Sequence, residues 1–126
     1  QPTTCRRQRQ MCIRDSPNYY PQSIAETLAA LTEAEVNESI MVDASHGNSQ
    51  KIFKNQIPVI SSICEQIIGG NKNLNGVMIE SHLVEGNQKI SDNLVYGQSI
   101  TDGCMNIEDI EGCFKELDAA VSKSRG

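Results

Sequence analysis

Two short apolar runs, each of which stops abruptly at polar residues, most constrain how this chain can fold. The first run is Ile40-Met41-Val42 and the second is Gly76-Val77-Met78-Ile79. Between them, residues 50–68 carry apolar side chains at three- and four-residue steps, which predicts a helix. Strand, helix and strand in this order indicate a parallel α/β fold with right-handed crossovers. Because two strands do not complete such a sheet, we expect further strands outside this sequence.

Amphipathic helices are also predicted on both sides of this unit. Ile24, Leu28 and Leu31 give an apolar stripe to a helix from about residue 21 to residue 34. A last helix begins near Asn106, whose side chain can cap it, with Asp109 three residues further on. The buried face of this last helix is predicted to consist of Ile107, Ile110, Phe114, Leu117 and Val121.

Proline and glycine mark the limits of the central helix. Pro58 lies inside the apolar pattern, so either the helix kinks there or its first turns form a separate segment. Gly69-Gly70 is a predicted C-cap. After the second strand, residues 84–101 are rich in Gly, Asn, Gln and Ser and are expected to form a long polar loop.

The charge distribution separates a basic leader from an acidic body. The formal net charge is -5, yet residues 1–15 hold four arginines and a single acid, Asp15. We therefore divide the chain into a leader, residues 1–16, and a body, residues 17–126. The leader resembles either translated adapter sequence or a native basic arm that contacts phosphate backbones. The body has no basic surface of the kind that binds nucleic acid, and the start without Met predicts a piece of a longer protein.

The cysteines and the hydropathy of the chain indicate in which cellular compartment it is expected. Five cysteines are present, and none forms a Cys-x-x-Cys pair of the kind used for zinc or for redox chemistry. A reduced, cytoplasmic environment is expected. No apolar run has the length of a secretory signal or of a bilayer span, so no membrane partner is expected.

Three polar residues stand where functional residues of parallel α/β folds are found, beyond the strands at their carboxyl ends. His46 follows the first strand, Glu80 closes the second, and Asp102 ends the long loop. One imidazole and two carboxylates suit Mn²⁺, Fe²⁺ or Zn²⁺. Simpler interpretations remain open, because His46 can serve as a donor within its loop and Asp102 can belong to the approach to the last helix.

Three longer motifs in order make the interpretation specific. They are Val42-Asp43-Ala44-Ser45-His46-Gly47-Asn48-Ser49, residues 76–88 with Ile79-Glu80-Ser81-His82, and residues 96–104 with Ile100-Thr101-Asp102. From about Pro17 to the C-terminus the chain closely resembles the microbial class I family of 3-deoxy-D-arabino-heptulosonate 7-phosphate (DAHP) synthases. The resemblance implies the C-terminal portion of a (β/α)₈ TIM barrel, with the last two strands and their helices.

The resemblance also implies roles for individual residues. His46, Glu80 and Asp102 match the family's ligands for a divalent metal ion, Mn²⁺, Fe²⁺ or a similar ion. His46 is also expected to approach the phosphate of phosphoenolpyruvate. The family's fourth ligand is a cysteine on a barrel strand that this sequence does not include, and Cys104 matches a cysteine that the family does not use. Cys64 and Cys113 lie on apolar helical faces and are expected in the core.

The family reaction joins phosphoenolpyruvate to erythrose 4-phosphate, releases phosphate and opens aromatic amino-acid biosynthesis. The resemblance implies this activity for a parent enzyme that is a cytoplasmic homo-oligomer, with a fragment that is inactive alone. The alternative is a non-catalytic α/β module or an inert product of truncation. The inhibiting amino acid and the native metal are left open, because the family's effector sites draw largely on other regions.

Overall fold

The computed structural model describes residues 16–126, so residues 1–15 of the predicted leader lie outside the described part. The named elements in chain order are α2 (Pro21–Glu33), β1 (Ile40–Asp43), α3 (His46–Ser49), η1 (Phe53–Asn55), α4 (Gln56–Ile68), β2 (Leu74–Met78), β3 (Val84–Asn87), β4 (Gln98–Ser99) and α5 (Ile107–Arg125). The predicted helices and both predicted strands are therefore present. The order is that of an α/β protein.

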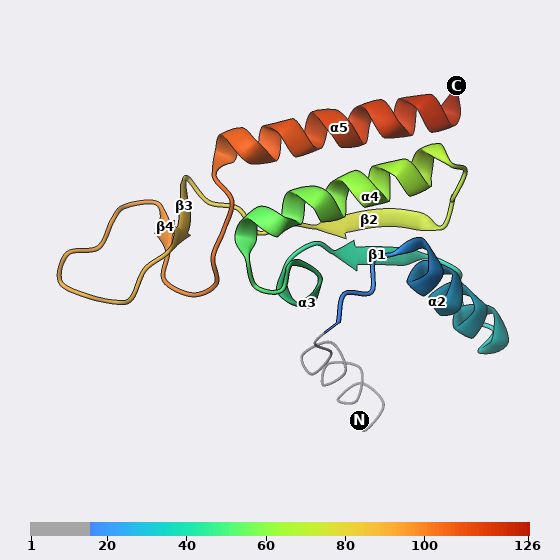
Figure 1. The fold of residues 1–126 in the computed structure, drawn as a ribbon, viewed down its shortest axis with the longest axis horizontal. Helices are drawn as coiled ribbons and strands as arrows, with labels where there is room; N and C mark the ends of the chain where they lie inside the picture. Colours follow the sequence, from blue (N-terminus) through green and yellow to red (C-terminus); the bar gives the residue numbers. More distant parts are fainter. Residues whose placement is uncertain (1–15) are drawn as a thin grey trace.

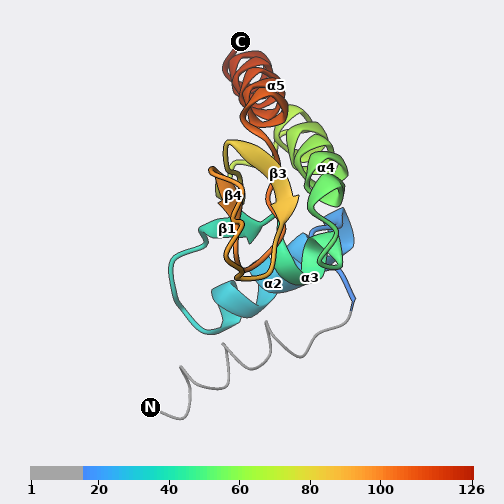
Figure 2. The same cartoon turned by 90° about the vertical axis from the view of Figure 1, so that its left-hand side faces the viewer.

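The central unit is a pair of parallel strands packed with helices. Helices α4 and α5 lie side by side beyond β2, and α2 lies beyond β1, at the opposite edge of the pair (Figure 1; Figure 2). β1 pairs with β2 in parallel, with Val42 opposite Val77 and Asp43 opposite Met78. No third strand joins this sheet within residues 16–126, and no closed barrel is formed there. Both strands therefore end at the same edge, where the loops that follow them meet.

The strand pair is covered only in part. Residues 76–79 keep some exposed surface, and Met41 on β1 is 70% exposed. The reason is that the described chain provides one neighbouring strand for β2 and covers the pair incompletely. Met41 instead folds over Gly76, where an added Cβ would lie 3.0 Å from its Cε.

Helix α4 begins later than the apolar stripe suggested, which decides between the two alternatives for Pro58. A separate 3₁₀ turn, η1, comes first, and Pro58 is the third residue of α4. The missing N–H of proline costs nothing there, because first-turn donors have no partner within a helix. At the other end, Gly70 adopts a φ of 103°. Its N–H donates to Ile67 and the next N–H donates to Gln66, which closes the helix in a Schellman motif.

The core lies between β1, α4 and α5. Its buried apolar residues are Ile24, Ile40, Val42, Ala44, Val59, Ile60, Ile63, Cys64, Leu74, Met105, Cys113 and Ala120. The placement of Cys64 and Cys113 in the core is confirmed.

The predicted buried face of α5 was partly wrong, because Ile107 and Phe114 are more than half exposed. α5 packs chiefly on α4, and its fully buried residues are Cys113 and Ala120, both with small side chains. Asn106 caps α5 as expected, with its Oδ1 accepting from the N–H of Asp109 at 2.8 Å. None of the helices in residues 16–126 combines the length and the apolar character that crossing a membrane requires.

The segment from residue 84 to residue 101 is more ordered than a polar loop. It contains β3 and β4, which pair in parallel. Gln88 holds the turn closed, because its Nε2 donates to the carbonyls of Val95 and Gln98 and its Oε1 accepts from the N–H of Val95. Side-chain amides rather than apolar periodicity organise this segment, which explains why the strands could not be recognised in the sequence.

A pH prediction follows from the burial of Cys64. Burial raises the pKa of its thiol to about 11 from 9.0. The folded state thus keeps a proton that the unfolded chain loses between pH 9 and pH 11, and stability falls as the pH rises through this window. We expect the free energy of unfolding to decrease by about 2 to 3 kcal/mol over that range. Urea unfolding at a series of pH values measures this free energy. Cys64→Val is the control, because it lacks the ionisable thiol, and its free energy of unfolding should decrease less over the same range.

Candidate metal centre

His46 lies three residues after the end of β1, at the start of α3, in a turn that the carboxylate of Asp43 stabilises. Asp43, the last residue of β1, accepts from the N–H of Ser45 at 2.8 Å, and its carbonyl accepts from Asn48 Nδ2 at 2.7 Å. His46 itself has a φ of 45°, in the left-handed region. Non-glycine residues reach this region at a cost of about 1 to 2 kcal/mol. The hydrogen bonds to Asp43 offset this cost and keep the imidazole at the strand end.

The second oxygen of Asp43 orients the imidazole of His46. Nδ1 of His46 donates to Asp43 Oδ2 at 2.8 Å. This bond leaves Nε2 to face away from Asp43, toward the end of β2. The hydrogen bond to Asp43 raises the pKa of His46, with further contributions from the charges of Asp43, Glu80 and Asp102, while partial burial opposes the shift.

Glu80 reaches the imidazole from beyond the end of β2. Its Oε1 lies 3.5 Å from His46 Nε2. Its Oε2 accepts from Ser45 Oγ at 2.6 Å, so the carboxylate is fixed by a residue of the β1 turn. Ser45 is buried, whereas 24% of the Glu80 side chain is exposed. Because β1 and β2 are parallel and in register, residues 35 positions apart meet at this edge.

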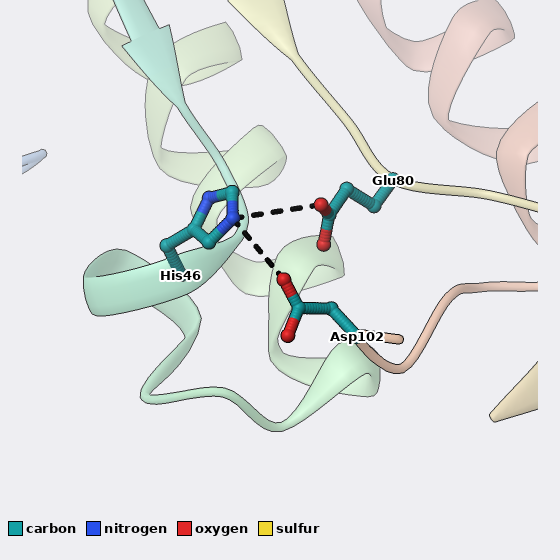
Figure 3. A group of neighbouring side chains, drawn as sticks. All are labelled: His46, Glu80 and Asp102. Carbon is teal, nitrogen blue, oxygen red and sulfur yellow. Dashed lines mark ion pairs between the residues drawn. The ribbon is translucent and has the colours of Figure 1, made fainter. Parts of the chain in front are cut away.

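Asp102 completes the group from the loop that precedes α5. Its Oδ2 lies 3.5 Å from His46 Nε2, and 64% of its side chain is exposed. Figure 3 shows Nε2 facing both carboxylates, which approach it from two different segments. The next residue, Gly103, packs on Phe53, where an added Cβ would lie 3.1 Å from the ring. The lack of a side chain at Gly103 thus lets the Asp102 loop come close.

The structure brings all three residues that we selected from the sequence into one group. One donor atom from each of His46, Glu80 and Asp102 lies within 4.8 Å of the other two. Ligand atoms about 2.1 Å from a common ion lie roughly 3 to 4 Å apart, so small rotations suffice to admit a divalent cation. The same residues line a cavity together with Ser45, Ser49, Lys51, Phe53, Asn87 and Gly103. The nitrogen and oxygen donor set therefore fits the expected metal, and the ligand roles remain a prediction.

The cysteines of the described region are not part of this donor group. Cys104 is nearby, but its thiol donates to the carbonyl of Asp102 at 3.6 Å. Cys64 and Cys113 are buried between the helices.

Sequence reasoning missed the residues that support the three donors. Asp43 and Ser45 lie in the first motif, but no pattern assigned them to His46 and Glu80. Gln56 was also not recognised as a supporting residue, although it lies in the apolar stripe of α4, four residues before Ile60. A polar residue at a core position of a helix is the signal that could have identified it.

Comparisons with known proteins identify the family of the chain. Residues 4–114 match the sequence model of the DAHP synthetase I family. The Phe-sensitive phospho-2-dehydro-3-deoxyheptonate aldolase of Escherichia coli K12 is 46% identical over 112 residues, which cover 87% of this chain and 32% of that enzyme. The Trp-sensitive aldolase of Salmonella typhi is 47% identical over 107 residues, which cover 83% and 31%.

A solved structure gives the same result in three dimensions. The phospho-2-dehydro-3-deoxyheptonate aldolase of Francisella tularensis SCHU S4 superimposes with a TM-score of 0.85 at 44% identity, over 88% of this chain and 33% of that one. The chain thus spans about a third of the length of the relatives it matches. With a family match across most of its length, this chain belongs to the DAHP synthetase I family.

Proposed function

We propose that this chain is the C-terminal portion of a DAHP synthase barrel and supplies three metal ligands to it. The parent enzyme would condense phosphoenolpyruvate with erythrose 4-phosphate, with release of phosphate. The observation that carries the proposal is the convergence of His46, Glu80 and Asp102 within 4.8 Å, at the strand ends of a chain from this family. A divalent ion bound there would act as a Lewis acid toward the aldehyde oxygen.

The residues of this chain would prepare the site in two ways. Asp43 accepts a hydrogen bond from Nδ1–H of His46, so that the lone pair of Nε2 is available to a cation. Ser45 holds one oxygen of Glu80 and leaves the other toward His46. The side chains of Asp43, Glu80 and Asp102 also place three carboxylates around a single imidazole, and a divalent cation would offset their mutual repulsion.

His46 is also proposed to approach the phosphate of phosphoenolpyruvate. Its side chain is 44% exposed and lines the cavity that also includes Lys51. The ammonium group of Lys51 can bind a phosphate at this cavity by a charge-assisted hydrogen bond, next to the ring of His46. The remaining substrate contacts would come from parts of the barrel that this sequence does not contain.

The first prediction concerns metal binding by the 126-residue chain. We expect Mn²⁺ to broaden the NMR signals of residues around His46, with weak affinity because only three ligands are present. Glu80→Gln should lower this affinity at least about tenfold, since a ligand contributes no less than its supporting residues. Glu65→Gln, at an exposed position of α4, is the matched control and should bind as the unmodified chain does.

Two results of this titration would contradict the proposed ligands. One is unchanged Mn²⁺ affinity in the Glu80→Gln chain. The other is broadening that centres on exposed acids elsewhere, such as those of α5.

The second prediction concerns catalysis and uses a chimaera. Residues 17–126 replace the matched segment of the Phe-sensitive Escherichia coli enzyme, and phosphate release from phosphoenolpyruvate is followed with erythrose 4-phosphate and Mn²⁺. We expect metal-dependent turnover that requires both substrates. Asp102→Asn should reduce it by at least about 100-fold, because the amide removes a charged ligand. Asp92→Asn, an exposed position in the same loop region, is the control.

The chimaera also separates the two classes of function. Metal-dependent product formation would exclude the inert module. A folded chimaera that binds Mn²⁺ but releases no phosphate, or one in which Asp102→Asn keeps full activity, would contradict the proposed enzymatic role.

A further inference from the structure

Gln56, the first residue of α4, is a polar side chain without any exposed surface. Its Nε2 donates to the carbonyl oxygens of Phe53 at 3.2 Å and Glu80 at 3.1 Å. Its Oε1 accepts from the N–H of Glu80 at 2.8 Å. The amide therefore binds both backbone groups of one distant residue, and only this orientation matches donors to acceptors.

The contact lies where the β1–β2 pairing stops. The last bond along this edge runs from the N–H of Ala44 to the carbonyl of Met78 at 2.8 Å, two residues before Glu80. Beyond it β1 turns away into the His46 loop, so the Glu80 backbone has no partner from β1. Gln56 supplies the missing donor and acceptor, and the N–H of Met105 adds a second bond to the Glu80 carbonyl at 3.0 Å.

Fixing both backbone groups fixes the direction of the side chain. The N–H and the carbonyl of Glu80 define the planes on each side of its Cα, and therefore the direction in which its Cβ leaves the backbone. Ser45 then holds the far end of the same side chain through Oε2. A buried amide in a low-dielectric setting makes strong bonds and is costly to leave unpaired, so this arrangement resists rearrangement.

We propose that Gln56 is a positioning residue that sets the carboxylate of Glu80 for the metal centre. This inference rests on the proposed function, since it assigns a task to the proposed ligand Glu80. Gln56 acts through Glu80 and does not itself line the cavity. Its bond to Phe53 extends the effect, because the Phe53 ring supports Gly103 beside Asp102. The buried amide of Gln56 thus contacts groups that support both Glu80 and Asp102.

The test replaces Gln56 by methionine, which has a similar length and no amide. Hydrogen exchange followed by NMR, without metal, reports the N–H of Glu80 directly. We expect this amide to be protected in the unmodified chain and to exchange at least about tenfold faster in Gln56→Met, while the N–H of Ile63 in α4 stays protected. Mn²⁺ affinity should fall about 10- to 100-fold, the range for residues that support a metal ligand.

Two controls separate positioning from a loss of stability. Gln66→Met removes another α4 amide, which donates to Tyr19 far along the helix from Glu80. Ile60→Val destabilises the core without touching Glu80. Both should leave Mn²⁺ affinity and the relative protection of the Glu80 amide unchanged.

The outcomes distinguish this proposal from the proposed function. A Glu80 amide that exchanges as fast as an exposed loop amide in the unmodified chain would overturn the positioning role, whether or not the variant folds. So would Mn²⁺ affinity within twofold of the unmodified value in Gln56→Met when Glu80→Gln weakens it. If Glu80→Gln itself has no effect, the metal centre is contradicted, and the exchange of the Glu80 amide alone decides whether Gln56 positions that residue.

Discussion

The parallel pairing of β1 with β2 is the constraint on which the site depends. Asp43 lies opposite Met78, so the residues that follow each strand emerge at one edge and at one level. His46 and Glu80 meet there although they lie 34 positions apart in the sequence. A register change of one residue would turn Glu80 to the opposite face of the sheet and remove it from the imidazole. Val42, Ile60 and Ile63 belong to the buried apolar cluster that stabilises this register. The same packing therefore keeps His46 and Glu80 close to each other.

Much of the architecture was accessible from the sequence, because it follows local rules. The spacing of Ile24, Leu28 and Leu31, the cap at Asn106 and the glycines after Ile68 each depend on neighbours within a turn or two. The failures have a different origin. Phe114 fits an apolar stripe as well as Cys113 does, and only the closeness of α4 and α5 decides which one is buried. β3 and β4 depend on the amide of Gln88, a contact that no periodicity reveals.

The same distinction between local patterns and tertiary contacts applies to the candidate metal centre. His46, Glu80 and Asp102 were identified because each follows or ends a recognisable segment and each falls in a motif of the resemblance. Their supports were not, since the bond between Asp43 and His46 forms only in the folded turn after β1, and Ser45 and Gln56 act through contacts that join different segments. Such contacts include the 2.6 Å bond from Ser45 to Glu80 and the paired bonds from Gln56 to the same residue. The three donor residues could be identified from the sequence, whereas the orientation of their side chains depends on the folded chain.

The left-handed backbone of His46 limits how the position can be probed. Histidine, asparagine and aspartate enter this region more readily than most residues, whereas β-branched side chains are strongly disfavoured. A valine or threonine here would add conformational strain to the loss of the imidazole, and the two effects would be inseparable in any measured defect. Asparagine tolerates the backbone while removing the ring nitrogens. It is consequently the exchange that isolates the contribution of the imidazole itself.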